Sequence, residues 1–157
     1  MLDIIIRPLQ SQDDELCRQC HVIEALCYPE SEALNIFSEA IKPNMHIFFA
    51  QEPASHTKKE SELCHGYVLF QKTSLMISIC KIVILPHYRR LGVGRQLLKS
   101  VVEFATQKGI GVCSLNVEET NLAALALYKS EGFLECDRRP DFYAIGRHGL
   151  HMEKDIG

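Results

Sequence analysis

A short glycine-containing segment separates an apolar stretch from a helical pattern in the middle of the chain. It reads Arg89-Arg90-Leu91-Gly92-Val93-Gly94-Arg95 and follows the apolar run that ends at Pro86. Closely spaced glycines let the backbone approach a ligand, and the amides at a helix start favour an anion. The pattern indicates a pyrophosphate-binding turn, although a tight turn without a ligand explains this segment alone. A P-loop or a dinucleotide fingerprint fits poorly, because Gly-Lys-Ser/Thr and a third glycine are missing.

A second pair of residues with chemical potential follows on a later helical segment. Asn121 and Tyr128 are separated by about two helical turns, so their side chains face the same way. An asparagine amide can hydrogen-bond an amide-bearing ligand, and a tyrosine hydroxyl can give a proton. Taken singly, Asn121 is equally well explained as a helix cap, and Tyr128 is better explained as a core residue. Together with the glycine segment, they favour a ligand-binding and catalytic role.

The elements that must position these residues alternate in type along the chain. β-Branched and apolar patterns predict strands at 3–9, 45–51, 65–71, 75–85, 112–117, 133–136 and 141–154, the last interrupted near 146–149. Helical spacing predicts helices at 11–26, 30–41, 92–108 and 121–130, with Ser11 capping the first, and a polar loop covers 52–62. This order predicts a mixed α+β sheet with helices on both faces.

Composition narrows the class of protein. The chain has 157 residues, of which 46% are hydrophobic, and a formal charge of −3. We therefore expect one globular domain over residues 1–157, without the broad basic face of a nucleic-acid binder. No apolar run is long enough for a membrane span, and the first residues lack a signal-peptide core. Seven scattered cysteines favour reduced thiols in the cytoplasm. Cys17-x-x-Cys20-His21 is interpreted as helix core, so no metal is expected.

The two motifs resemble those of the GNAT superfamily of acetyl-CoA-dependent N-acetyltransferases. Residues 89–94 match its acyl-CoA signature, Arg/Gln-x-x-Gly-x-Gly/Ala, and Asn121, Tyr128 and Gly132-Phe133 match its later signature. The resemblance covers residues 4–154, and within the superfamily the chain looks most like RimI-type and N-terminal protein acetyltransferases. It implies the GNAT fold, a mostly antiparallel sheet of about seven strands. The fourth and fifth strands of that sheet would splay apart, and about four helices would cover its faces.

The resemblance also implies acetyl-CoA as cosubstrate. Main-chain groups of the fourth strand would pair with the pantetheine arm. The glycine turn, which we define as residues 89–94, would hold the pyrophosphate, and Asn121 would contact the pantetheine. Tyr128 would protonate the departing sulfur. The implied cofactor-binding residues are Ile82, Val83, Ile84, Arg89, Arg90, Leu91, Gly92, Val93, Gly94, Arg95, Asn121 and Tyr128.

The group that removes the amine proton is less well defined. RimI-type relatives carry a glutamate where this chain has Asn116, whose amide is not a base. Glu118, Glu119, His46 or an ordered water are the candidates, and each of these side chains also fits a solvated surface position. His46 and Tyr143 are expected to bind the acceptor, with core packing an equal alternative for Tyr143. Two interpretations of Lys81 stay open, an edge position and a place in the acceptor cleft.

The expected activity is acetyl transfer to a protein or peptide N-terminal α-amine by direct attack in a ternary complex. An α-amine, with a pKa of about 8, is neutral more often than a lysine at about 10.4. The alternatives are a small-molecule acetyltransferase acting on a polyamine, amino acid or aminoglycoside, and a non-catalytic acyl-CoA sensor. The Tyr128 hydroxyl favours catalysis over sensing. We expect an amine acceptor as partner, neither nucleic acid nor membrane, and a monomer or homodimer.

Overall fold

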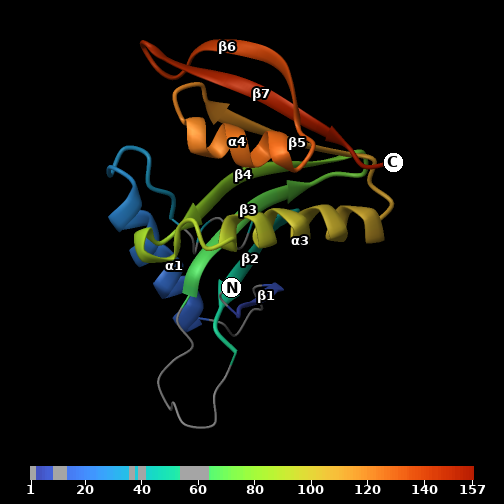
Figure 1. Cartoon of the computed structure of the whole chain (residues 1–157). Helices are drawn as coiled ribbons and strands as arrows, with labels where there is room; N and C mark the ends of the chain where they lie inside the picture. Colours follow the sequence, from blue (N-terminus) through green and yellow to red (C-terminus); the bar gives the residue numbers. More distant parts are fainter. Residues whose placement is uncertain (1–2, 9–13, 36–37, 39–41, 54–63) are drawn as a thin grey trace. The chain divides into compact units, whose positions relative to one another are not determined.

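The computed structural model of the chain describes residues 3–8, 14–35, 38, 42–53 and 64–157. Seven strands are hydrogen-bonded in the order β1-β2-β3-β4-β5-β7-β6, and the described residues include three α-helices and one 3-10 turn (Figure 1). The elements are β1 (Ile5–Pro8), α1 (Asp14–Cys27), β2 (Met45–Gln51), β3 (Cys64–Lys72), β4 (Met76–Ile84), η1 (Pro86–Tyr88), α3 (Val93–Gln107), β5 (Val112–Glu118), α4 (Leu122–Ser130), β6 (Leu134–Ala144) and β7 (Arg147–Asp155).

The chain forms two compact units. The first unit takes the described residues of Met1–Phe70 and Lys81–Val101, and the second takes Gln71–Cys80 and Val102–Gly157. Both contain part of the mixed sheet, so the α+β prediction is confirmed. None of the helices in the described part of the chain is long and apolar enough to cross a bilayer.

The first unit has its core between α1 and the strands β2, β3 and β4. The helix contributes apolar side chains at helical spacing, and the strands contribute alternate residues from one face. Each fully buried side chain of this kind stabilises the fold by about 1.5–3 kcal/mol. The buried members of this cluster are Leu16, Cys20, Ile23, Ile47, Phe49, Cys64, Tyr67, Leu69 and Val83.

A glycine sets the distance between β3 and β4. A Cβ atom added at Gly66 would lie 2.5 Å from the carbonyl oxygen of Val83 and 2.7 Å from the Cδ1 atom of Ile84. Because one of these neighbours is backbone, a side chain here would force the strands to move. The close approach fixes the last half of β4, which leads through η1 into the glycine turn at residues 89–94.

In the second unit, β5 pairs with strands on both sides. It is parallel to β4 over four residue pairs, from Met76–Val112 to Ile79–Leu115, and antiparallel to β7 from Val112–Asp155 to Glu118–Gly149. The parallel ladder ends at Ile79, whereas β4 continues to Ile84 and β5 to Glu118. A short ladder of this kind is what the predicted splay of the fourth and fifth strands requires.

The C-terminal hairpin corrects the predicted strand boundaries. β6 continues past Cys136 to Ala144, and the hairpin turn lies at 145–146 rather than near 146–149, with Gly146 at a φ of 79°. Pro140 does not end the strand because β6 lies at the edge of the sheet, where a missing amide costs no ladder hydrogen bond. Register shifts between Glu135 and Asp137 and between Arg139 and Ala144 accommodate the irregular pairing.

Other predicted elements are close to the observed ones or fall outside the described residues. The strands at 45–51 and 112–117 and the helices at 92–108 and 121–130 differ from the structure by at most a residue or two at their ends. Residues 30–32 of the predicted second helix form a turn, and 36–37 and 39–41 lie outside the described residues. Ser11 and most of the polar loop at 52–62 also lie outside them.

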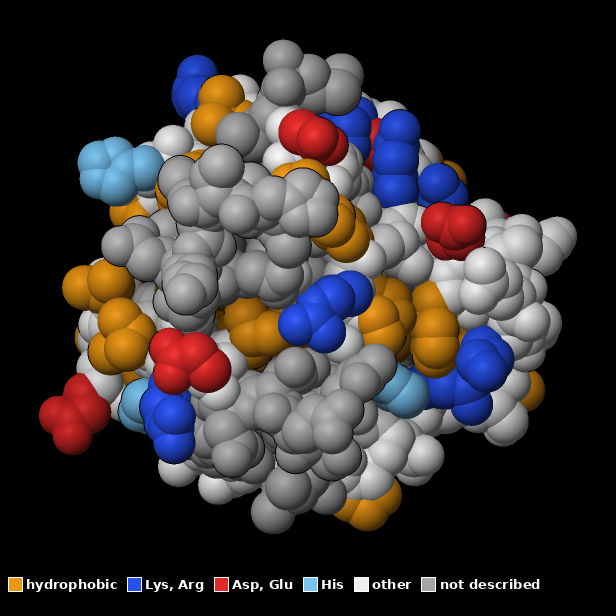
Figure 2. Space-filling view, turned by 90° about the horizontal axis from the view of Figure 1, so that it is seen from below, with side chains coloured by type: hydrophobic (Ala, Val, Ile, Leu, Met, Phe, Trp, Pro, Cys, Tyr) orange, Lys and Arg blue, Asp and Glu red, His pale blue; other side chains and the backbone are white. Residues whose placement is uncertain are grey.

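Charged side chains are mixed on the surface. On the face shown in Figure 2, the described Lys and Arg side chains stand among acidic and hydrophobic ones rather than forming one continuous basic area. This distribution agrees with the near balance of 17 basic and 20 acidic residues.

Candidate active site

The glycine turn of the first unit has the backbone geometry of an anion-binding helix start. Arg90 and Gly92 have φ values of 62° and 85°, and α3 begins directly after them at Val93. Gln96 N donates to Gly92 O at 3.1 Å, the first hydrogen bond of the helix. The amides of Gly92, Val93 and Gly94 lie before this bond, so no carbonyl of the helix is placed to accept from them. A left-handed arginine is costly in a free turn, which indicates that its surroundings impose this conformation.

Contacts with β3 and β4 hold this turn and the residues before it in place. Arg89 Nε donates to Ile84 O at 3.0 Å, folding its side chain back onto the end of β4. The Tyr88 ring is stacked on the His65 ring with centroids 3.7 Å apart, and Leu85 N donates to His65 O at 2.9 Å. Burial lowers the pKa of His65, so its ring is neutral at pH 7. The turn is thus preorganised before any ligand arrives.

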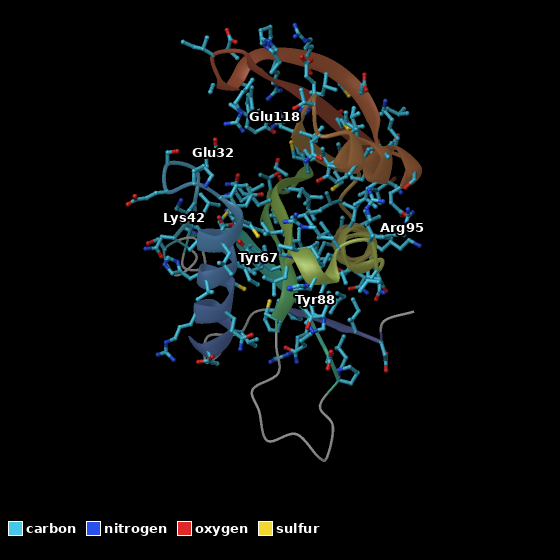
Figure 3. All side chains as sticks on the ribbon, turned by 60° about the vertical axis from the view of Figure 1, so that its left-hand side comes forward. Glu32, Lys42, Tyr67, Tyr88, Arg95 and Glu118 are labelled. Carbon is cyan, nitrogen blue, oxygen red and sulfur yellow. The ribbon has the colours of Figure 1, made fainter. Side chains whose placement is uncertain are left out.

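The predicted cofactor-binding residues of the first unit differ in whether their side chains or only their backbone groups can contact a ligand. The side chains of Val83 and Val93 are buried, so these residues can offer a ligand only backbone groups. Arg90, Leu91 and Arg95 are exposed, whereas Arg89 is engaged within the turn. Figure 3 labels Arg95 on the outer side of α3. The range 82–84 lies past the last residue pair of the β5 ladder, which ends at Ile79.

In the second unit, α4 carries the two predicted residues of the later signature. Asn121 caps the helix, with its Oδ1 accepting from Ala124 N at 3.2 Å. The cap uses the amide oxygen, while the amide nitrogen is not part of it. Tyr128 is half-buried, and its ring lies 6.1 Å from that of Phe133 in a tilted arrangement. The structure therefore shows the helix cap at Asn121 and the packing of the Tyr128 ring near Phe133.

Both candidate glutamate bases are engaged by arginines of the second unit. Arg147 Nε donates to Glu118 Oε1 at 2.6 Å, and Arg138 donates to Glu119 through two bonds of 2.7 and 2.9 Å. Hydrogen bonds from Arg138 hold the pKa of Glu119 below its ordinary value. Figure 3 labels Glu118 in the second unit. A carboxylate that already accepts from a guanidinium is a weaker proton acceptor for a substrate.

The two predicted acceptor-binding residues lie in different units. Tyr143 is 38% exposed, packs edge-on against Phe142 at 5.0 Å, and has the Arg147 guanidinium 5.9 Å from its ring centroid. Arg147 therefore links Tyr143 to Glu118, so the structure brings these two predicted residues near one another. His46 belongs to the first unit, where its ring stacks at 5.3 Å on that of Phe70.

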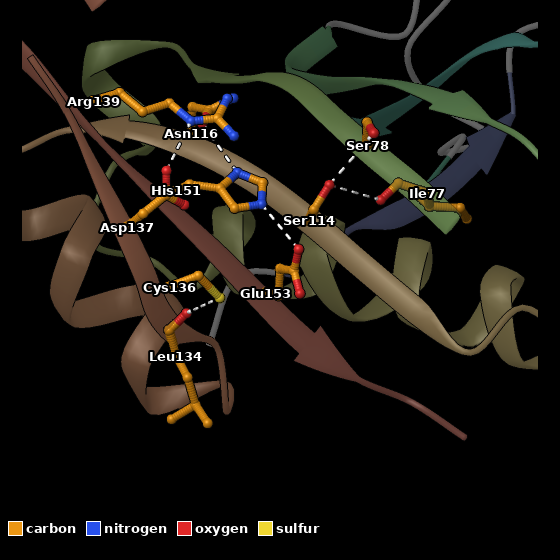
Figure 4. A network of polar contacts seen from close by, with 10 residues as sticks. All are labelled: Ile77, Ser78, Ser114, Asn116, Leu134, Cys136, Asp137, Arg139, His151 and Glu153. Carbon is orange, nitrogen blue, oxygen red and sulfur yellow. Dashed lines mark hydrogen bonds and ion pairs between the residues drawn. The ribbon is translucent and has the colours of Figure 1, made fainter. Parts of the chain in front are cut away.

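A polar network on β5 and β7 was not found from the sequence. His151 Nδ1 lies 3.2 Å from Asn116 Oδ1, and His151 Nε2 lies 3.0 Å from Glu153 Oε1 (Figure 4). A separate contact joins Ser114 of β5 to Ser78 of β4 at 3.4 Å. Alternation along the last strand could have placed His151 and Glu153 on one face. Their position opposite Asn116 depends on strand register, which the sequence does not reveal.

A second unpredicted cluster surrounds a buried carboxylate in the first unit. The Glu24 side chain is 1% exposed and receives hydrogen bonds from Lys81 Nζ at 2.9 Å and from the Tyr67 hydroxyl. Lys81 also donates to Glu32 O at 2.8 Å and lies 3.7 Å from the centroid of the Tyr28 ring. Burial and the bond to Glu24 raise the pKa of Tyr67. Lys81 is therefore a structural ion-pair partner inside the first unit.

Comparison with known proteins assigns the family. The acetyltransferase (GNAT) family model matches residues 14–133, which is more than half of the sequence. The chain belongs to this family, as its motifs predicted. The [ribosomal protein bS18]-alanine N-acetyltransferase of Escherichia coli (strain K12) is 36% identical over 66 residues, which are 42% of this chain and 45% of the relative. The chain thus spans about half the length of the curated relative that it matches.

Solved structures confirm the predicted GNAT fold over nearly the whole chain. The crystal structure of the ribosomal-protein-S18-alanine N-acetyltransferase from Escherichia coli has a TM-score of 0.78 at 24% identity, covering 98% of this chain and 94% of that one. A chain of the NatC complex bound to Gag peptide and CoA has a TM-score of 0.82 at 17% identity, covering 99% and 100%. At these identities, the likeness establishes the fold.

Proposed function

We propose that this chain transfers the acetyl group of acetyl-CoA to a protein or peptide N-terminal α-amine. The observation that carries the proposal is the preorganised turn at residues 89–94, which matches the acyl-CoA signature and opens directly into α3. The E. coli relative is named for acetylating an alanine of a ribosomal protein, which favours a protein acceptor over a small molecule. A cytoplasmic location and a monomeric or homodimeric state stay predictions.

The residues of the first unit suit a diphosphate-bearing carrier. The amides of Gly92, Val93 and Gly94 point from a helix start, where the helix dipole favours negative charge. Arg90 and Arg95 add positive charge at the same segment. Backbone groups of Ile82, Val83 and Ile84 are available beyond the β5 ladder for the amide-bearing pantetheine arm. Leu91 is exposed and adds an apolar contact to the same turn.

Acetyl-CoA supplies an activated carbonyl and a thiol leaving group. In our proposal, Asn121 donates its amide nitrogen to the pantetheine arm, since the helix cap uses its oxygen. Tyr128 gives its hydroxyl proton to the sulfur as the carbon–sulfur bond breaks, which removes the cost of releasing a thiolate. Tyr143 and His46 are the proposed contacts to the acceptor. The helix and the contact with Phe133 fix the Tyr128 ring, so the acid is already oriented.

A thiol-release assay with a panel of amines tests the proposal. We expect wild-type protein to release CoA with acetyl-CoA and peptides that begin with Ala or Ser, and less with polyamines or aminoglycosides. Preference for a small amine would favour the small-molecule alternative. Absence of CoA release with every amine in the panel would favour the acyl-CoA sensor. Tyr128→Phe should lower kcat by about 10- to 1000-fold with little change in the dissociation constant of acetyl-CoA.

The matched control for this variant is Tyr28→Phe, which removes a hydroxyl from a ring that packs in the first unit and lies against the Lys81 ammonium. This variant should keep the wild-type kcat. Equal kcat values for Tyr128→Phe and wild type would refute the role of Tyr128 as acid.

A further inference from the structure

One histidine of the second unit has the surroundings of a general base. His151 lies on β7, its side chain is 14% exposed, and its two ring nitrogens face Asn116 and Glu153. Histidine is the side chain that ordinarily changes protonation between about pH 5 and 8. A carboxylate on one ring nitrogen fixes the tautomer and leaves the other nitrogen as the proton acceptor, which is the recurring arrangement of base and orienting group.

The neighbouring groups on this face are poorer proton acceptors. Asn116 offers an amide, which has no basic lone pair. Glu118 and Glu119 are each bound by an arginine, at 2.6 Å from Arg147 Nε and 2.7 Å from Arg138 Nε. Taking a proton would break these ion pairs, whereas His151 can take a proton on Nδ1 while its Nε2–H keeps the hydrogen bond to Glu153 Oε1.

The geometry points to His151 as the base that accepts the proton of the attacking amine on Nδ1, the nitrogen that faces Asn116, while Glu153 orients the ring through Nε2. This inference rests on the proposed acetyl transfer. Glu153 accepts from Nε2–H at 3.0 Å, which leaves the lone pair on Nδ1, on the side of Asn116. The Asn116 amide can rotate to donate to Nδ1 in the absence of substrate, and the amine then replaces it there.

Each proton and bond of the step has a defined destination. His151 Nδ1 takes a proton from the amine nitrogen as that nitrogen bonds to the acetyl carbonyl carbon. Tyr128 gives its hydroxyl proton to the sulfur as the carbon–sulfur bond breaks. Solvent then takes the proton from His151 and returns one to Tyr128. The sum is one amide and one free thiol from one amine and one thioester, with no further reactant.

The polar and charged groups near His151 come from three strands. β5 contributes the Asn116 amide and, two residues on, the Glu118 carboxylate, and β7 contributes Glu153. On β6, Asp137 is the residue paired with His151, and Arg139 donates to Asp137 at 3.4 Å (Figure 4). The pH dependence of the reaction is therefore read on variants that leave Asp137 and Arg139 unchanged.

The pH profile of kcat/KM with an α-amine peptide tests the base directly. In wild type, the slope of log kcat/KM against pH should increase from about one to about two as the pH falls, because the amine and the base must then both lose a proton. His151→Gln should lower kcat/KM by about 100-fold, the low end for a general base, and leave a slope of about one throughout. The control His148→Gln, on the same strand, should keep the wild-type slopes.

A second variant and a binding measurement separate the chemistry from stability. Glu153→Gln keeps the imidazole and should lower kcat/KM by about ten-fold while retaining the change of slope. Nitrogen NMR of the histidine rings should show that acceptor peptide, added without acetyl-CoA, shifts the Nδ1 signal of His151 and not that of His148. A ring signal of His151 that ignores the peptide would overturn the proposal, as would a His151→Gln protein with the wild-type slopes.

Failure of the base and failure of the function give different results. If wild type acetylates a peptide and His151→Gln does so with an unchanged profile, the base assignment is wrong and acetyl transfer stands. If wild type releases no thiol with any amine, the proposed function is wrong, and the role of His151 falls with it.

Discussion

Replacing Lys81 by methionine leaves the buried Glu24 carboxylate without its cation. Lys81 Nζ lies 2.9 Å from Glu24 Oε2, and the side chains are 16% and 1% exposed. Removing one partner of a buried ion pair typically costs about 3–5 kcal/mol. The Tyr67 hydroxyl and Leu34 N still donate to the carboxylate, so we expect the low end, about 3 kcal/mol of unfolding free energy. For a chain of this size, that lowers Tm by about 6–12 °C.

Urea unfolding followed by circular dichroism measures the loss, with thermal unfolding as a second reading. Lys129→Met is the matched control, because Lys129 pairs with Glu135 at 2.9 Å with side chains 56% and 45% exposed. An exposed pair contributes at most about 1 kcal/mol. Adding Glu24→Gln to Lys81→Met should restore most of the loss, since the uncompensated charge is then gone. Equal costs for Lys81→Met and Lys129→Met would refute this reasoning.

Three further predictions concern stability. Because burial lowers the pKa of His65, stability is present above its unfolded pKa of about 6.5 and falls as the pH decreases from there; urea midpoints at several pH values should show this fall, and His65→Gln should flatten it. Gly66→Ala should cost about 1–3 kcal/mol in the same unfolding assay, since its Cβ would lie 2.5 Å from Val83 O; an unchanged midpoint would contradict the close approach. Asn121→Ala should cost about 1 kcal/mol through the lost cap to Ala124 N, a loss that Asn121→Asp should largely avoid.

The glycine turn and the elements around it could be predicted because their signals are local. The apolar strand, the Pro86 stop, the two glycines and the amphipathic helix are contiguous in the sequence. Gly92 has a φ of 85°, and a glycine beside a helix start indicates such a backbone conformation from the sequence. The N-cap function of Asn121 was equally local, and the structure shows it.

Features that depend on register or on edge position were not predictable in the same way. Pro140 signals the end of a strand, yet an edge strand tolerates it, so β6 continues to Ala144. The contact between Asn116 and His151 needs the antiparallel alignment of β5 with β7, which no local pattern specifies. Lys81 stood out in its strand, but its partner Glu24 lies 57 positions away on α1.

The most direct test of the central claim is a proton–nitrogen correlation NMR titration with CoA. The amides of Gly92 and Gly94 should shift saturably with CoA, whereas those of Gly109 and Gly146, which lie in other turns, should stay in place. Pantetheine, which lacks the pyrophosphate, should leave Gly92 and Gly94 nearly unmoved. Unshifted amides at millimolar CoA, or equal shifts with pantetheine, would contradict a pyrophosphate site at residues 89–94.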